Sequence, residues 1–208
     1  MIEILIYGGN LILLINIILF IIGFSRNGKA YKIFTCYLGI VFSIQIVSWI
    51  IQLFHMHNLF LSHFYFIGQF ILLGMFYENL LKTSQQKYFG KWVIALVLMA
   101  LFVQYLVDPN QFVQFNLFEI AITSLIVVVF AVLHLYNMLA DKKEFYFINL
   151  GIIIYLFGST ILFFVGNLTA SLSPKFSLIT WTLNAFLYIV YQLFVLIEWK
   201  KSFSSKIL

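Results

Sequence analysis

The sequence contains very little charge. Only 9% of its 208 residues are Asp, Glu, Lys or Arg, whereas 63% are hydrophobic. Soluble globular domains are about one-quarter charged, so this composition excludes a soluble protein built around one core. The mean hydropathy of +1.05 points the same way. Most of the side chains therefore need lipid as their solvent.

Cysteine and proline are nearly absent. Cys36 is the only cysteine, which excludes a disulfide framework within the chain. The two prolines, Pro109 and Pro174, both lie in polar breaks between apolar runs. A proline can begin a helix there because the N–H that it lacks would have no partner. No basic segment precedes the first apolar run, so we expect a retained helix and not a cleaved signal peptide.

Seven continuous apolar runs occupy most of the chain. A membrane-spanning helix needs about 20 apolar residues, whereas the strands of a membrane barrel are shorter and alternate in polarity. The runs therefore predict an all-α, polytopic membrane protein, a bundle of seven transmembrane helices that forms one transmembrane domain over residues 1–208. The expected spans are residues 2–24, 33–54, 59–81, 92–107, 112–139, 145–165 and 176–199.

The basic residues are distributed unevenly between the two sides of the expected bundle. Eleven of the twelve Lys and Arg lie in the first, third and fifth loops or in the tail, and Lys175 is the exception. The positive-inside rule then places the N-terminus outside and the C-terminus in the cytoplasm, in a multi-pass protein of the cytoplasmic (inner) membrane. We attribute the net charge of +5 to topology and to contacts with membrane lipids. Direct nucleic-acid binding is not expected, because it requires basic residues gathered on a larger surface.

Glu119 is the strongest candidate for a functional side chain within a span. An ionisable group in lipid is costly and often marks a functional site. Asn116 and Thr123 lie three residues before and four residues after it, which places them on the same helix face. Two interpretations remain open. Glu119 titrates or binds a ligand in a cavity, or it forms a hydrogen bond to a neighbouring helix near the outer interface.

Two other glutamates lie close to the expected cytoplasmic ends of spans. Glu78 has Lys82 four residues after it, and Glu198 has Lys201 three residues after it. Such spacings bring opposite charges together on one helix face. We therefore expect Glu78 and Glu198 to form ion pairs at the membrane interface.

The sixth and seventh spans carry polar faces. Asn184 and Tyr188 are one helical turn apart in the seventh span, and Asn149 and Tyr155 lie in the sixth. Polar residues at these positions are expected to face protein and not lipid. By the predicted topology Glu119, Asn184 and Tyr188 lie in the outer half of the membrane, with Asn149 and Tyr155 behind them. These five residues could line a shared polar pocket, and hydrogen bonding between helices without a pocket is the alternative.

The sequence indicates no metal or cofactor site. His55, His57 and His63 bracket the second outer loop, but no Cys or Asp lies nearby to complete a zinc site, so we interpret them as loop histidines. A retinal Schiff base needs a lysine in the last span, and residues 176–199 contain none. The chain also lacks a Gly-rich phosphate loop, a Ser–His–Asp set and a His-Glu-x-x-His helix. We therefore expect neither a cofactor nor retinal, and a non-enzymatic role is favoured.

The last third of the chain contains a pattern of spaced polar and small residues. The pattern is Phe147-x-Asn149-x-Gly151-Ile-x-x-Tyr155-x-x-Gly158-Ser159-x-x-Leu162-Phe163, followed by Trp181-x-x-Asn184. It resembles the small seven-span membrane proteins of Bacteroidetes-type bacteria, which stand alone or form the membrane domain ahead of sensor histidine kinases. The resemblance covers residues 145–199. It implies a sensory or partner-regulating module, and because no kinase follows, we expect the output to be another polypeptide.

The sequence is compatible with three functions. The first is a non-enzymatic sensory or partner-regulating module that acts through a protein partner. The second is an oligomeric channel or pore, in which the chain associates with copies of itself. Membrane accessory proteins encoded beside bacterial defence systems, including CRISPR loci, are similar in general sequence character. The third is a membrane-embedded enzyme that acts on lipids. A co-purifying partner would favour the first, ion flux through liposomes the second, and lipid turnover the third.

Overall fold

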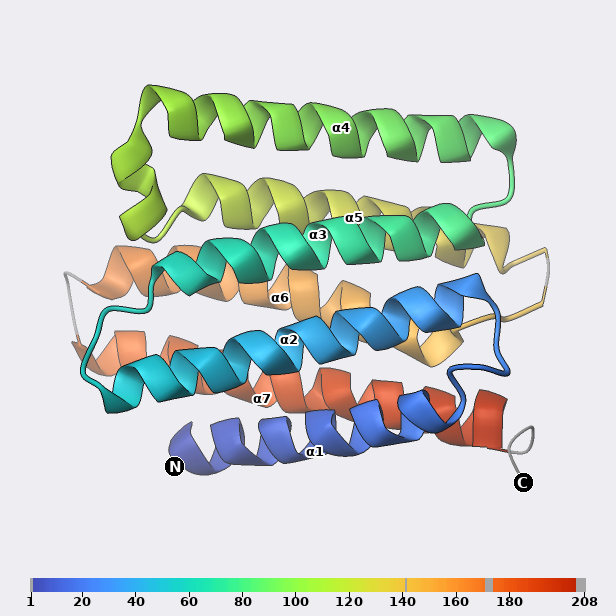
Figure 1. Ribbon diagram of the computed structural model, residues 1–208, viewed down its shortest axis with the longest axis horizontal. Coiled ribbons are helices and arrows are strands. Elements are labelled where there is room, and N and C mark those ends of the chain that lie inside the picture. Colours follow the sequence, from blue (N-terminus) through green and yellow to red (C-terminus); the bar gives the residue numbers. More distant parts are fainter. Residues whose placement is uncertain (1, 141, 171–173, 205–208) are drawn as a thin grey trace. The chain divides into compact units, whose positions relative to one another are not determined.

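The structure is a computed structural model that describes residues 2–140, 142–170 and 174–204 (Figure 1). Within these residues, seven helices are long and apolar enough to cross a membrane. The all-helical, multi-pass prediction is therefore confirmed. The helices are α1 (Ile2–Ile22), α2 (Lys29–Leu53), α3 (Phe60–Leu80), α4 (Ser84–Val107), α5 (Leu117–Asn137), α6 (Tyr146–Ala170) and α7 (Pro174–Glu198). Two short helical turns, η1 (Pro109–Val113) and η2 (Trp199–Phe203), follow α4 and α7.

The chain divides into two compact units. The first unit contains Met1–Arg26 and Ala131–Leu208, and the second contains Asn27–Phe130. In the first unit, α7 packs against both α6 and α1. In the second unit, α3 packs against both α2 and α4, and the N-terminal part of α5 belongs to the same unit (Figure 1).

Aromatic and polar contacts join the helices of the second unit. The rings of Phe34 in α2 and Phe76 in α3 lie 5.3 Å apart, and the hydroxyl of Tyr37 donates to Oε1 of Gln69 at 3.3 Å. Between α3 and α4, a Cβ placed on Gly74 would lie 2.6 Å from Cδ1 of Ile94. Lipid gives apolar side chains little reason to associate, so close approach at glycine and interhelical hydrogen bonds hold such helices together.

Interhelical hydrogen bonds and close approach at glycine also join the helices of the first unit. Asn16 in α1 is buried, and its Nδ2 donates to both the carbonyl and the Oε1 of Gln192 in α7, each at 2.9 Å. Between α6 and α7, a Cβ on Gly151 would lie 2.9 Å from Cβ of Phe194. Hydrogen bonding therefore joins α1 to α7, and close packing at a glycine joins α6 to α7.

Helix α4 begins earlier than the hydropathy pattern indicates. We expected the fourth span at residues 92–107, but α4 starts at Ser84. The hydroxyl of Thr83 accepts a hydrogen bond from the backbone N–H of Gln86 at 3.2 Å, so it caps the helix. The first two turns are polar, so the apolar run marks only the part of α4 that lipid would cover.

The fifth and sixth helices also differ from their expected bounds. The fifth was expected from residue 112, yet the 3₁₀ turn η1 comes first and α5 starts at Leu117. The sixth was expected to end at residue 165 and continues to Ala170. Part of the expected sixth loop, residues 171–173, and Lys206 of the tail lie outside the described residues.

Candidate functional site

Glu119 occupies the first turn of α5, where its own backbone is held by the two residues predicted to share its face. Oδ1 of Asn116 accepts a hydrogen bond from the N–H of Glu119 at 3.0 Å, which makes Asn116 the N-terminal cap of α5. The hydroxyl of Thr123 donates to the carbonyl of Glu119 at 2.7 Å. The Glu119 side chain is fully buried. These local contacts fix the backbone position from which the Glu119 side chain extends.

The carboxylate of Glu119 meets side chains from two other helices. Nδ1 of His63 in α3 lies 3.1 Å from Oε2 and 3.2 Å from Oε1. The hydroxyl of Tyr105 in α4 donates to Oε2. All three residues belong to the second unit. We call His63, Tyr105, Asn116 and Glu119 the Glu119 cluster.

Tyr105 connects the members of this cluster. Its hydroxyl oxygen lies 2.8 Å from Nδ1 of His63, and it accepts a hydrogen bond from Nδ2 of Asn116 at 3.3 Å. When Glu119 is ionised and accepts the proton of Tyr105, a neutral imidazole carries its proton on Nδ1, because an ionised carboxylate only accepts hydrogen bonds. The cluster is thus a closed network in which Glu119 is the final acceptor.

The other ring nitrogen of His63, Nε2, lies outside this hydrogen-bond network. His63 is 1% exposed, and among the described residues Nε2 has no hydrogen-bond partner. Its ring stacks on Phe112 of η1, with the ring centres 5.1 Å apart and the planes at 22°. A carboxylate on Nδ1 fixes the orientation of an imidazole. Nε2 is therefore the atom of the cluster that is left to bind a further group.

Sequence reasoning missed His63 and Tyr105 as partners of Glu119. We grouped His63 with His55 and His57 as loop histidines, but it lies within α3 and is buried, whereas His55 and His57 are exposed. The position of each residue along the membrane normal is the signal that could have identified both partners. Adjacent antiparallel spans bring the start of the third, the end of the fourth and the start of the fifth to one side of the bundle.

The remaining predicted residues lie in the first unit. Tyr155 and Tyr188 contact each other with ring centres 5.7 Å apart, and Tyr155 also stacks on Tyr191 at 5.3 Å. Asn149 is buried, and its Nδ2 donates to the carbonyl of Ala131 at 3.1 Å. These polar side chains face protein, as expected.

Asn184 is half-buried, and its Oδ1 has no hydrogen-bond partner among the described residues. It lies one turn before Tyr188 on α7. Tyr188 itself packs over α1, where a Cβ on Gly9 would lie 2.8 Å from Cδ1 of its ring. Glu119 belongs to the second unit, and Asn184 and Tyr188 belong to the first, so each group is described by itself and the shared pocket stays a prediction.

The two glutamates expected in ion pairs have different environments. Nζ of Lys91 in α4 lies 3.2 Å from Oε1 of Glu78, at a partly exposed position, so Glu78 forms an ion pair with a lysine of the next helix. Glu198 is 1% exposed. Its Oε2 accepts the backbone N–H of Phe147 at 2.7 Å, and its Oε1 accepts the hydroxyl of Ser202 at 2.5 Å. Glu198 therefore caps the N-terminus of α6, where the helix dipole favours a carboxylate.

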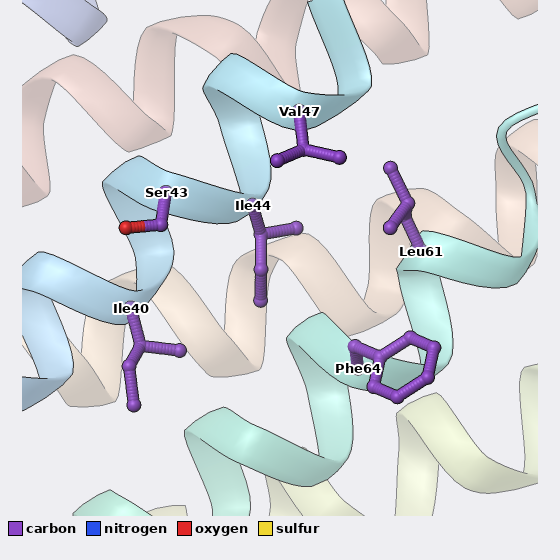
Figure 2. A pocket seen from close by; sticks show the side chains of 6 residues that line it. All are labelled: Ile40, Ser43, Ile44, Val47, Leu61 and Phe64. Atoms are coloured by element: carbon purple, nitrogen blue, oxygen red, sulfur yellow. The ribbon is translucent and has the colours of Figure 1, made fainter. Parts of the chain in front are cut away.

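A shallow groove lies between α2 and α3 in the second unit (Figure 2). Its volume is about 440 Å³, and its lining consists of Ile40, Ser43, Ile44, Val47, Leu61 and Phe64. Ser43 is the one polar lining residue, and its hydroxyl donates to the carbonyl of Gly39 at 2.9 Å. The groove therefore offers surface suited to a hydrocarbon chain and no group that could orient a polar ligand.

The described residues contain no group of three His, Cys, Asp or Glu side chains that could hold a metal ion. No protein-family model, curated protein or solved structure matches the chain. The resemblance to the membrane domains of sensor kinases therefore stays a prediction.

Proposed function

We propose that this protein is a non-enzymatic sensory module of the cytoplasmic membrane that regulates a protein partner, and that the Glu119 cluster is its sensing element. The single observation that carries the proposal is the buried carboxylate of Glu119 in α5, which contacts Nδ1 of His63 from α3 and the hydroxyl of Tyr105 from α4. An intramembrane ionisable group held in this way is expensive to keep unless it has a role.

The cluster has the properties of a two-state element. Its network depends on Glu119 accepting hydrogen bonds from both His63 and Tyr105. A proton added to the carboxylate, or a ligand bound at Nε2 of His63, changes the number of hydrogen-bond donors and acceptors within the cluster. The ends of three helices then favour a different arrangement, and a ligand shifts the equilibrium by its difference in affinity for the two.

The predicted topology gives the signal a direction. With the N-terminus outside, the Glu119 cluster lies near the outer surface, and the lysine-rich ends lie in the cytoplasm. Single cysteines introduced at Asn58 and at Lys87, each in a Cys36→Ala background, test this arrangement with a membrane-impermeant maleimide in intact cells. We expect labelling at residue 58 and none at residue 87. The reverse pattern would invert the topology and place the cluster on the cytoplasmic side.

The decisive experiment compares partner binding in native membranes. Tagged wild-type protein, the Glu119→Gln variant and the Glu78→Gln variant are purified in mild detergent and their co-purifying proteins are identified by mass spectrometry. Glu78→Gln is the matched control, because it makes the same chemical change at an exposed ion pair. We expect a stoichiometric partner whose recovery changes with Glu119→Gln and not with Glu78→Gln.

Two outcomes would contradict the proposal. Equal recovery of the partner with all three proteins would remove Glu119 from the sensing role. Recovery of the chain alone as a discrete homo-oligomer would favour the channel or pore, and ion flux through liposomes that contain the purified protein would then be the test.

A lipid-active enzyme is the second candidate, and one observation favours it. Glu119 orients Nδ1 of His63 and leaves Nε2 unpartnered, which is how a general base is held to activate water or a hydroxyl. The test is to incubate the purified protein with vesicles of fluorescent phospholipid. Product that forms with wild type and disappears with His63→Gln would favour the enzyme over the sensory module.

A further inference from the structure

A pair of aromatic rings at the start of α6 holds two lysine side chains. The rings of Tyr146 and Phe147 meet edge to face, with centres 5.3 Å apart. Nζ of Lys143 lies 5.2 Å from the centre of the Tyr146 ring, and Nζ of Lys201, in η2, lies 4.5 Å from the centre of the Phe147 ring. A cation over a ring is attracted by the negative face of the ring, which fixes its position without neutralising its charge.

Glu198, three residues before Lys201, has other partners. Glu198 is buried and accepts hydrogen bonds from the N–H of Phe147 and from Ser202. Among the described residues, no carboxylate lies within ion-pair distance of Lys143 or Lys201. Within the part of the chain that the structure describes, neither ammonium group is held in an ion pair.

The turn that carries Lys201 is anchored on two sides. Nε1 of Trp199 donates to the carbonyl of Leu19 in α1 at 2.9 Å. The Phe203 ring contacts that of Phe145 at 5.4 Å and that of Phe20 at 6.2 Å. These contacts fix the π-helical turn η2 against α1 and the start of α6. Lys201 is thus presented from a fixed backbone and not from a free tail.

We propose that Lys143 and Lys201, over the Tyr146–Phe147 pair, form a binding site for the phosphate of an anionic membrane lipid, such as phosphatidylglycerol. The site lies at an end of two apolar helices, so the acyl chains of a lipid can lie along α6 and α7 while its phosphate meets the ammonium groups. Lys142 and Lys200, both exposed, flank the site in the sequence and add to its positive charge. Aromatic side chains suit the same boundary because their rings prefer the headgroup level.

The test is native mass spectrometry of the detergent-purified chain, titrated with phosphatidylglycerol or with phosphatidylcholine of the same chain length. Wild type is compared with the Lys143→Gln/Lys201→Gln double variant. The matched control is Lys29→Gln/Lys87→Gln, which removes the same charge from the second unit. We expect the first double variant to bind phosphatidylglycerol at least tenfold more weakly, since each lysine near an anionic surface contributes about fivefold. The control should bind as wild type does.

Several results would overturn the proposal. Equal loss in both double variants would indicate a general effect of net charge, and equal binding by all three proteins would indicate no site. Displacement of the lipid by inorganic phosphate at millimolar concentration would mean that the site recognises free phosphate. The Lys143→Arg/Lys201→Arg variant should retain binding, because it keeps both charges, and a loss there would also count against the assignment.

Discussion

Nδ1 of His63 lies 3.1 Å from Oε2 of Glu119, although the two residues are 56 positions apart in the sequence. Helix α4 comes between their helices in the chain and contributes Tyr105, which contacts both. The contact therefore needs α3, α4 and α5 to be in place at once. It ties the chemistry of the candidate site to the packing of the second unit.

The first prediction concerns the strength of this contact. A double-mutant cycle with His63→Ala and Glu119→Ala should give a coupling energy of about 1–3 kcal/mol, because a buried charged group loses its partner in each single variant. The same cycle with Lys91→Ala and Glu78→Ala, at an exposed ion pair, should give about 0–1 kcal/mol. Unfolding of the purified proteins in mixed detergent measures both. Equal coupling energies would mean that the Glu119 cluster is no stronger than a surface pair.

The second prediction concerns access to Nε2 of His63, over which Phe112 stacks. Diethyl pyrocarbonate should modify the exposed His55 and His57 of the wild type and spare His63. In Phe112→Ala, we expect His63 to be modified as well, since the stacked ring is gone. Peptide mass spectrometry identifies each modified histidine.

The control for this experiment is Phe118→Ala, which removes another exposed ring from the start of α5. His63 should stay protected in that variant. Modification of His63 already in the wild type would show that Nε2 is open to solvent without any movement of Phe112.

The third prediction concerns the N-terminal cap of α4. Thr83→Ala removes the acceptor for the N–H of Gln86 and should lower the free energy of unfolding by about 1 kcal/mol. Ser84→Ala is the control, because Ser84 lies inside the helix and is not its cap. Hydrogen exchange of the amides at residues 84–87 should accelerate in Thr83→Ala only. Acceleration in both variants would argue against Thr83 as the specific cap.

The fourth prediction compares two glycines. Gly151→Ala should destabilise the chain by about 1–3 kcal/mol, because the new Cβ would lie 2.9 Å from Cβ of Phe194, an atom that cannot move without the α7 backbone. A Cβ on Gly39 meets nothing within 4 Å, so Gly39→Ala should be neutral or stabilise α2 by up to about 1 kcal/mol. Detergent unfolding measures both changes. A neutral Gly151→Ala would show that α6 and α7 can separate locally.

Long apolar runs and the polar residues inside them were predictable from the sequence. Glu119 stood out because a carboxylate within an apolar run is rare unless it has a structural partner or a function. Helical spacing then predicted that Asn116 and Thr123 share its helix face. Helix ends were less predictable. Hydropathy reports the part of a helix that lipid covers, so the polar first turns of α4, capped by Thr83, were assigned to a loop.

The sequence by itself determined the class of this protein, because length and continuous hydrophobicity leave only membrane-spanning helices as a way to satisfy the backbone in lipid. The sequence also identified Glu119 as an ionisable residue whose burial in a membrane span costs free energy. Only the tertiary structure decided that His63 and Tyr105 surround the carboxylate and that Glu198 turns inward to cap α6. Side-chain partners from different helices depend on the rotation and depth of each helix, and an apolar sequence that suits lipid on nearly every face records neither.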